Sequence, residues 1–288
     1  MSSALLSIGG LALLLEGDES VGKAMELPGV DVFAIQGDVT PNICFVLDTA
    51  APQAPARELH SFAVMDGSGV CRFCVDADGV YQYRFSANES VSFDPRHPSK
   101  ATITPMSSPS LLRFALWLAY SMTGVAYGRM PVHASTVVCE RRAVLCLGES
   151  GTGKSTHTRL WLQNIPHTHL LNDDSPIVAA RRDAPALVYG SPWSGKIHCY
   201  RQEHYPIAAL LRLEQRPENI IRRLSTLEAF AALQPSCPPS MAHDERCLNV
   251  VVQLVSAVLT HTPAFRLGCL PDADAALLSH STIYSQPL

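Results

Sequence analysis

The chain has 288 residues, of which 47% are hydrophobic and 17% are charged, so it can bury one large core or two smaller ones. Its formal net charge of −4, with no stripe of Lys or Arg, argues against a general nucleic-acid-binding protein. Nine cysteines, an odd number scattered along the chain, favour reduced thiols in a cytoplasmic compartment.

The sequence predicts no membrane segment. The apolar stretch 4–15 has no basic residues before it and contains Gly9-Gly10, which argues against a signal peptide. The apolar run 111–120 contains Arg113 and is too short to span a bilayer, so we expect it to be a buried helix.

Residues 1–100 predict a small β-rich module, because short apolar or alternating runs alternate with turn signals such as Asp78-Gly79. The strand candidates are 11–15, 32–35, 43–47, 62–65, 70–75 and 81–85. Cys71 and Cys74 form a C-x-x-C, but no second pair follows at zinc-site spacing, so two ordinary half-buried cysteines are expected.

A stretch rich in Pro, Ser and Thr, 94–109, is the predicted linker to a second domain, residues 101–288. In this domain strand and helix patterns are mixed, which predicts an α/β (α+β mixed) fold. The strand candidates are 132–138, 143–147, 169–171, 187–189 and 207–213, and the helix candidates are 110–122, 157–163, 226–233, 247–259 and 272–279.

The most specific motif is Gly148-Glu149-Ser150-Gly151-Thr152-Gly153-Lys154-Ser155-Thr156, which fits the phosphate-loop pattern G-x-x-x-x-G-K-S/T at each required position. A predicted strand precedes it and a predicted helix follows it. Gly151 and Gly153 allow consecutive N–H groups to point at an anion, and the helix N-terminus adds its positive end. Lys154 is expected to reach the β- and γ-phosphates, and Ser155 to offer its hydroxyl to Mg²⁺. The motif predicts binding of a nucleoside triphosphate such as ATP; the alternative is a Gly/Ser turn without a ligand.

Asp173 and Asp174 follow an apolar run about twenty residues after the phosphate loop, where a Mg-nucleotide site needs carboxylates. One can hold the metal and the other can accept a proton from an attacking hydroxyl. The alternative is a solvated turn before Pro176.

The stretch 190–196 follows a predicted strand, and ligands gather at the C-terminal ends of such strands. Lys196 and Arg201 could neutralise a transferred phosphoryl group there, although a surface turn with a packed Trp193 is an equal alternative. His133 lies on the strand before the phosphate-loop strand and, by its pattern alone, is expected to be a core histidine.

With His133 upstream of the loop and Asp173-Asp174 after it, residues 130–200 resemble the catalytic core of HPr kinase/phosphorylase. Members of that family are bacterial serine kinases, and their fold is related to that of ATP-dependent phosphoenolpyruvate carboxykinase. The resemblance implies that the loop and Lys154 hold the triphosphate, that Ser155 and Asp174 bind Mg²⁺, and that Asp173 is the base, supported by His133. Relatives include hexamers, so a homo-oligomer is possible.

This chain departs from the family in two places, the stretch 190–196 and the N-terminal module, and these departures leave the acceptor open. The sequence therefore predicts a Mg-ATP-dependent kinase that acts on a hydroxyl, in the first place a serine of a protein or peptide. A metabolite kinase of the same fold and a nucleotide-sensing module without catalysis are the alternatives.

Overall fold

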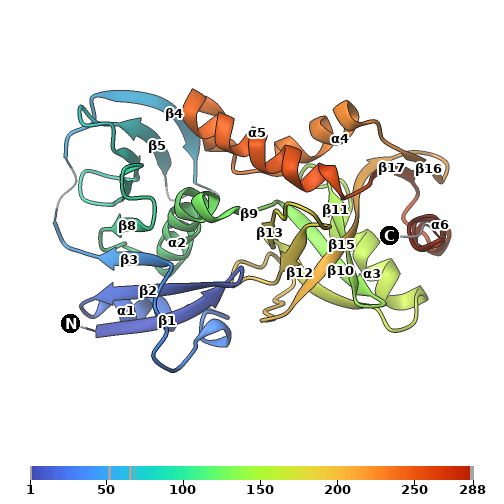
Figure 1. Ribbon diagram of the computed structural model, residues 1–288, viewed down its shortest axis with the longest axis horizontal. Coiled ribbons are helices and arrows are strands. Elements are labelled where there is room, and N and C mark those ends of the chain that lie inside the picture. The colour runs from blue at the N-terminus through green and yellow to red at the C-terminus, as the bar shows by residue number, and fades with distance from the viewer. Residues whose placement is uncertain (1, 51–52, 65–66, 68, 286–288) are drawn as a thin grey trace. The chain divides into compact units, whose positions relative to one another are not determined.

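The computed structural model describes residues 2–50, 53–64, 67 and 69–285, which form two sheets with helices (Figure 1). The chain divides into two compact units. The first consists of Met1–Tyr127 and Ser240–Leu248, and the second of Gly128–Pro239 and Asn249–Leu288. The fold is therefore of the mixed α/β class, as the sequence predicted. No helix in the described part of the chain has the length and apolar character needed to cross a membrane.

The first unit contains an eight-stranded sheet in the order β1-β2-β3-β8-β7-β6-β5-β4. Its strands are β1 (Ser2–Ile8), β2 (Leu11–Gly17), β3 (Ile43–Leu47), β4 (Arg57–Ala63), β5 (Val70–Val75), β6 (Tyr81–Arg84), β7 (Ser90–Phe93) and β8 (Lys100–Ile103). The predicted strand at 32–35 is wrong, since a 3₁₀ helix, η1 (Asp31–Phe33), occupies that region with the short helix α1 (Ser20–Met25) before it. The candidate at 62–65 overlaps the end of β4, and its Met65 lies outside the described residues.

The predicted linker 94–109 is also wrong, because β8 lies within it, between β3 and β7. Its apolar residues Ala101 and Ile103 are buried in the core. The helix α2 (Pro109–Gly124) begins immediately afterwards, capped by the Ser108 hydroxyl, and packs on β7 and β8 (Figure 1). The boundary between the units therefore falls after η2 (Val125–Tyr127) and not near residue 100.

A returning segment completes the first unit. The residues after η3 (Gln234–Ser236) form η4 (Pro239–His243) and the first turn of α5 (Glu245–Thr260). Tyr83 Oη is 2.8 Å from Ser240 Oγ, and Tyr81 Oη donates to Asp244 Oδ1 at 2.8 Å. The imidazoles of His60 and His243 stack with their centroids 3.6 Å apart. Nothing in the local sequence indicates that 240–248 belongs with the first unit.

The second unit is built on a nine-stranded sheet whose main path runs β12-β10-β11-β15-β14-β13-β9, with β17 beside β15 and β16 beside β17. Its strands are β9 (Arg129–Pro131), β10 (Ala134–Cys139), β11 (Arg142–Leu147), β12 (His169–Asp174), β13 (Ile177–Ala179), β14 (Leu187–Tyr189), β15 (His204–Gln215), β16 (Ile220–Arg223) and β17 (Ala264–Cys269). β15 pairs in parallel with β11 and β17, and the other pairs are antiparallel.

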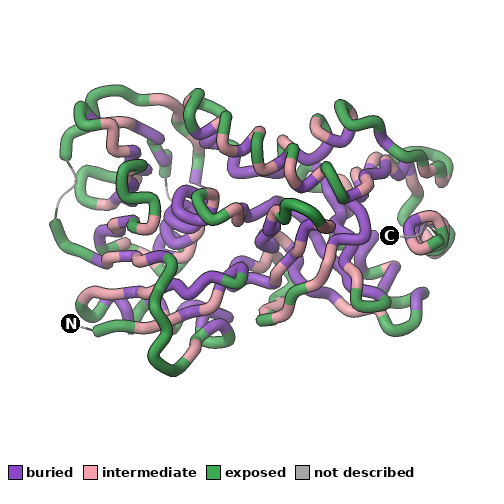
Figure 2. The backbone as a smooth tube through the Cα atoms, in the orientation of Figure 1, coloured by how far each residue is buried: buried purple, intermediate pink, exposed green. Residues whose placement is uncertain are grey.

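Helices cover one face of this sheet. Both α3 (Lys154–Asn164) and α6 (Ala273–Tyr284) pack there, around the fully buried Trp161. β10 and the adjoining part of β11 are buried along their length (Figure 2). The predicted helices 226–233 and 247–259 correspond to α4 (Thr226–Leu233), with a capping box at Ser225 and Glu228, and to α5. The end of β11, where the glycine-rich loop begins, is thus buried among the central strands.

Candidate functional site

The glycine-rich motif forms a closed loop between β11 and α3, so the strand and helix predicted on either side of it are present. Gly148, Gly151 and Gly153 have φ values of 156°, 85° and 99°, a region that favours glycine. A Cβ on Gly148 would also collide with the Thr152 side chain. Thr152 Oγ1 donates to the Glu149 carbonyl at 2.9 Å and tightens the turn. The loop therefore has glycine at each of its positive-φ positions, and it leads directly into the N-terminus of α3.

Lys154, the first residue of α3, folds back along the loop. Its Nζ donates to the carbonyls of Gly148 and Glu149 at 2.8 and 3.1 Å, and it lies 2.9 Å from His133 Nε2. Burial lowers the pKa of Lys154, while the nearby carboxylate of Asp174 acts in the opposite direction. The ammonium is thus satisfied by weak acceptors that a phosphate oxygen can replace.

His133 links Lys154 to Asp174. Its Nδ1 lies 3.2 Å from Asp174 Oδ1, on the side of the ring opposite Lys154. Because an ammonium group can only donate, we assign Nε2 as the acceptor, which places the ring proton on Nδ1, facing Asp174. The side chains of His133 and Asp174 are 46% and 36% exposed, so the pair faces solvent. The expectation of a core histidine at this position is therefore wrong.

Asp173 lies in different surroundings from its neighbour. It is buried, and its Oδ1 accepts from Ser135 Oγ at 2.6 Å. Ser135 Oγ is in turn 3.1 Å from Thr158 Oγ1, which donates to the Ser155 carbonyl at 3.2 Å. Asp173 is thereby connected to the helix that carries Ser155.

The alternation of side chains along β12 explains this difference. The register joins Asp173 to Ser135 on β10 and then to Cys146 on β11, which belongs to the core beneath α3. The register pairs Asp174 with Ala134, so the Asp174 side chain lies on the opposite face of the sheet from Asp173. The pairing of His133 with Asp173 that the family resemblance implied is therefore corrected: His133 contacts Asp174.

Two arginines that sequence reasoning missed lie on the same face as Asp174. The row that contains Asp174, Ala134 and Leu147 continues to Arg212 on β15 and Arg266 on β17. Arg212 is 3.6 Å from Glu149 Oε1 in the glycine-rich loop. Each arginine is a single charged residue within an apolar strand, and this pattern could have marked it in the sequence. The strand pairing that brings the two arginines together cannot be read from the sequence.

The stretch that follows β14 packs against the end of β12. Asn172, fully buried, donates to the Ser191 and Trp193 carbonyls at 3.3 and 3.2 Å, and its Oδ1 accepts from the amides of Asp174 and Ser175 at 3.0 and 2.8 Å. A Cβ on Gly195 would lie 2.7 Å from the Asp173 carbonyl. This backbone contact places the loop directly beside the carboxylates.

The two cations predicted in this stretch behave differently. Lys196 follows Gly195 and is exposed, with no hydrogen bond or ion pair to the described residues. The guanidinium of Arg201 lies 3.3 Å from Glu203 Oε1 and is occupied by that carboxylate. Trp193 is buried, as the alternative interpretation expected.

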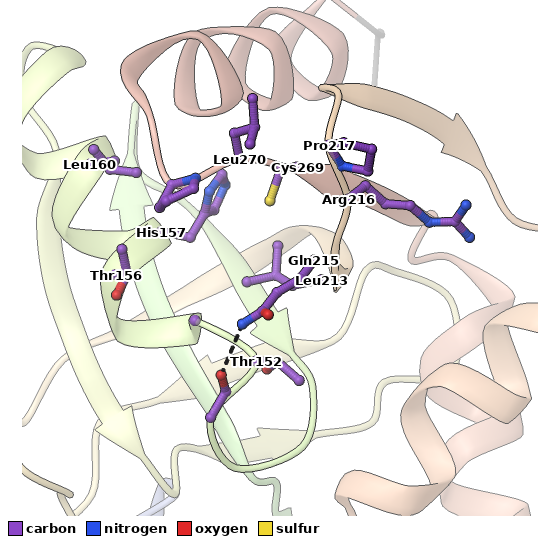
Figure 3. A pocket seen from close by; sticks show the side chains of 13 residues that line it. Thr152, Thr156, His157, Leu160, Leu213, Gln215, Arg216, Pro217, Cys269 and Leu270 are labelled. Atoms are coloured by element: carbon purple, nitrogen blue, oxygen red, sulfur yellow. Dashed lines mark hydrogen bonds between the residues drawn. The ribbon is translucent and has the colours of Figure 1, made fainter.

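A pocket of about 530 Å³ opens beside the loop and the N-terminus of α3 (Figure 3). Its walls include the apolar side chains of Leu160, Leu213 and Leu270, and Gln215 Nε2 donates to the Gly151 carbonyl at 3.2 Å. His157 also lines the pocket; burial lowers its pKa to about 4, so it is neutral near pH 7. A second hollow, of about 470 Å³, is lined by Arg212, Arg266, Glu214 and loop residues 149–152.

No protein-family model matches the chain, and neither does any curated protein. Among solved structures, the chain is similar to the Hpr(Ser) kinase/phosphatase from Coxiella burnetii. The two share 12% sequence identity, the match covers 54% of this chain and 88% of that chain, and the TM-score is 0.28. A likeness of this size carries no information about activity.

Proposed function

We propose that the protein is a Mg-ATP-dependent phosphotransferase that moves the γ-phosphoryl group to a hydroxyl. The observation that supports this most directly is the contact of Lys154 with both the phosphate loop and His133, which is paired with Asp174. Lys154, which is expected to hold phosphate, and His133, which can accept a proton, are therefore in hydrogen-bond contact with each other. A loop that served only to bind nucleotide would not require that contact.

In the proposed complex, the loop amides and the α3 N-terminus bind the phosphates. The Lys154 ammonium exchanges its carbonyl and imidazole partners for phosphate oxygens, which form stronger, charge-assisted hydrogen bonds. The apolar pocket beside Thr156 and Leu270 accommodates the nucleoside.

The residues around Ser155 fit Mg²⁺, which prefers oxygen ligands and retains several waters. Ser155 is exposed at the start of α3, and the Asp173 carboxylate connects to the same turn through Ser135 and Thr158. Ser155 and Asp173 would hold the ion. When bound, Mg²⁺ supplies charge neutralisation on the phosphates.

When Lys154 turns to the phosphates, His133 Nε2 loses its hydrogen-bond donor, while His133 Nδ1–H remains hydrogen-bonded to Asp174. His133, oriented by Asp174, then accepts the proton of the attacking hydroxyl as the new O–P bond forms. This assigns the base to the His133–Asp174 pair and the metal to Asp173, which exchanges the roles that the sequence predicted for the two carboxylates.

We propose a serine of a protein or peptide as the acceptor, with a small hydroxyl compound as the second candidate. The exposure of His133 and Asp174 favours the first, because a side chain on a larger molecule can reach them. Lys196, exposed beside Asp174, is available to an anionic group on that acceptor.

The test is label transfer from γ-labelled ATP with Mg²⁺ in a lysate of the source organism, with products separated by size. Asp174→Asn should lower transfer about 100- to 10,000-fold and keep ATP affinity. Asp173→Asn should raise the Mg²⁺ concentration needed. Asp183→Asn, an exposed residue of the same unit, is the matched control.

Label in a macromolecule supports a protein or peptide kinase, and label in small molecules a metabolite kinase. Wild-type rates with Asp174→Asn would refute the His133–Asp174 assignment. ATP binding without any transfer would favour the nucleotide-sensing alternative.

A further inference from the structure

Three arginines stand in one row across the edge of the second sheet. The register places Arg212 on β15 opposite Arg266 on β17, and Arg266 opposite Arg222 on β16. Neighbouring strands are about 4.8 Å apart, and like charges directly opposite each other are destabilising. Such a row therefore has an energetic cost unless other groups neutralise it.

The carboxylates nearby neutralise only part of the row. Arg222 is bound by Glu228, with contacts of 2.6 and 3.1 Å. Glu149, the partner of Arg212, is 84% exposed and 3.6 Å away, so this ion pair is weak.

The third carboxylate, Glu214, has its own partner. It forms an ion pair with Arg216 at 3.1 Å, and Arg216, more than Arg266 and Arg212, lowers the pKa of Glu214. Arg266 has no ion pair with the described residues, and its buried Nε has no hydrogen-bond partner among them. Arg212 and Arg266 together thus retain donors for an anion.

We propose that Arg212 and Arg266 form a clamp for the diphosphate part of the bound nucleotide; this rests on the proposed function. Both arginines line the 470 Å³ hollow together with loop residues 149–152. Their guanidinium groups present forked N–H donors that match phosphate oxygens. An anion held there by both guanidiniums removes the repulsion between them.

The order of residues along the row decides which phosphates the clamp takes. Leu147, from which the loop departs, lies between Asp174 and Arg212, two strands from the first and one from the second. The carboxylate end of the row repels phosphate, so the phosphates that remain on the nucleotide lie away from it. The same end carries the proton acceptor, so the γ-phosphoryl group, which is transferred, is the phosphate nearest to it. The arginine end takes the phosphates that remain with the nucleotide.

The clamp acts on the bond that breaks. The acceptor oxygen loses its proton to His133 Nε2 and forms a bond to the γ-phosphorus. The bond from that phosphorus to the β,γ-bridging oxygen breaks, and its electron pair stays on the β-phosphate. Arg212 and Arg266 stabilise the charge that develops there.

The experiment measures calorimetric binding of ADP, ATP, AMP and pyrophosphate to Arg212→Gln and Arg266→Gln. We expect affinity for ADP, ATP and pyrophosphate to fall about ten- to a hundredfold, with AMP little changed. Arg222→Gln, in the same row but held by Glu228, is the matched control. Arg266→Lys keeps the charge and stem should Arg266→Gln fold poorly, and should recover only part of the affinity.

A second readout separates a clamp from a structural role. Thermal unfolding without ligand should occur at the same or a higher temperature for Arg266→Gln, because a repulsion is removed. A marked loss of ligand-free stability together with unchanged ADP affinity would overturn the clamp. Weaker ATP binding with unchanged ADP binding would also overturn it, since the arginines would then hold the γ-phosphate.

The clamp and the proposed function fail in different ways. Phosphoryl transfer that is unaffected by Arg212→Gln and Arg266→Gln refutes the clamp and leaves the phosphotransferase standing. Arginine-dependent binding of ADP and pyrophosphate, with no transfer to any acceptor, refutes the phosphotransferase and supports the clamp as a diphosphate site. Absence of binding in the wild-type protein refutes both.

Discussion

Replacing Asn172 by Ala should weaken the second unit more than any exposed Asn→Ala change. The side chain is fully buried. Its two amide hydrogens are shared among three acceptors, the Ser191 carbonyl, Ser191 Oγ and the Trp193 carbonyl, and its Oδ1 accepts two more hydrogen bonds, from the amides of Asp174 and Ser175. At about 1 kcal/mol for each hydrogen bond, the loss of all four costs about 4 kcal/mol of unfolding free energy. Water entering the space left by the amide would reduce this figure.

Urea unfolding followed by tryptophan fluorescence suits this measurement. Two of the three tryptophans, Trp161 and Trp193, lie in the second unit. Asn164→Ala is the matched control, because Asn164 is exposed and donates one hydrogen bond, to the Leu160 carbonyl. Turnover should fall with stability, since Asn172 also anchors the Asp174 amide. Equal unfolding midpoints for the two variants would refute the reasoning.

Three further changes test other parts of the site. Gly148→Ala places a Cβ against Thr152 at a φ of 156° and should cost about 1–3 kcal/mol and distort the loop, which nucleotide affinity and urea unfolding would reveal. The pKa of His157 falls from 6.5 to about 4 on folding, so the unfolded chain binds more protons between these values. Stability should therefore decrease by about 3 kcal/mol as the pH falls from 6.5 to 4, and His157→Gln should lack this component in pH-dependent urea unfolding. Lys154→Ala should weaken ATP binding at least tenfold by calorimetry, and unchanged affinity would exclude the loop as the phosphate site.

The glycine-rich loop between a strand and a helix could be predicted from the sequence because its determinants are local. Glycine at 148, 151 and 153, together with the apolar strand before the loop, fixes the backbone. The position of the two carboxylates at the end of β12 could be predicted for the same reason, but their different surroundings could not. Which of Asp173 and Asp174 meets His133 depends on the strand register with β10.

Other features depend on contacts between distant parts of the chain. Arg212 and Arg266 are 54 positions apart and meet only because β15 and β17 pair in parallel. The polar composition of 94–109 indicated a linker, whereas tertiary packing made β8 from it. β13, β16 and β17, which sequence reasoning did not predict, have three to six residues each and follow no pattern strong enough to detect alone.

Because residues 240–248 belong to the first unit, that unit is completed late during synthesis of the chain. A ribosome adding about 5–20 residues per second needs roughly ten seconds to proceed from Tyr127 to Ser240. Throughout that interval the nascent first unit lacks the groups that Tyr81, Tyr83 and His60 contact in the finished protein. Most of the second sheet, including the glycine-rich loop, is therefore synthesised before the residues that complete the first unit.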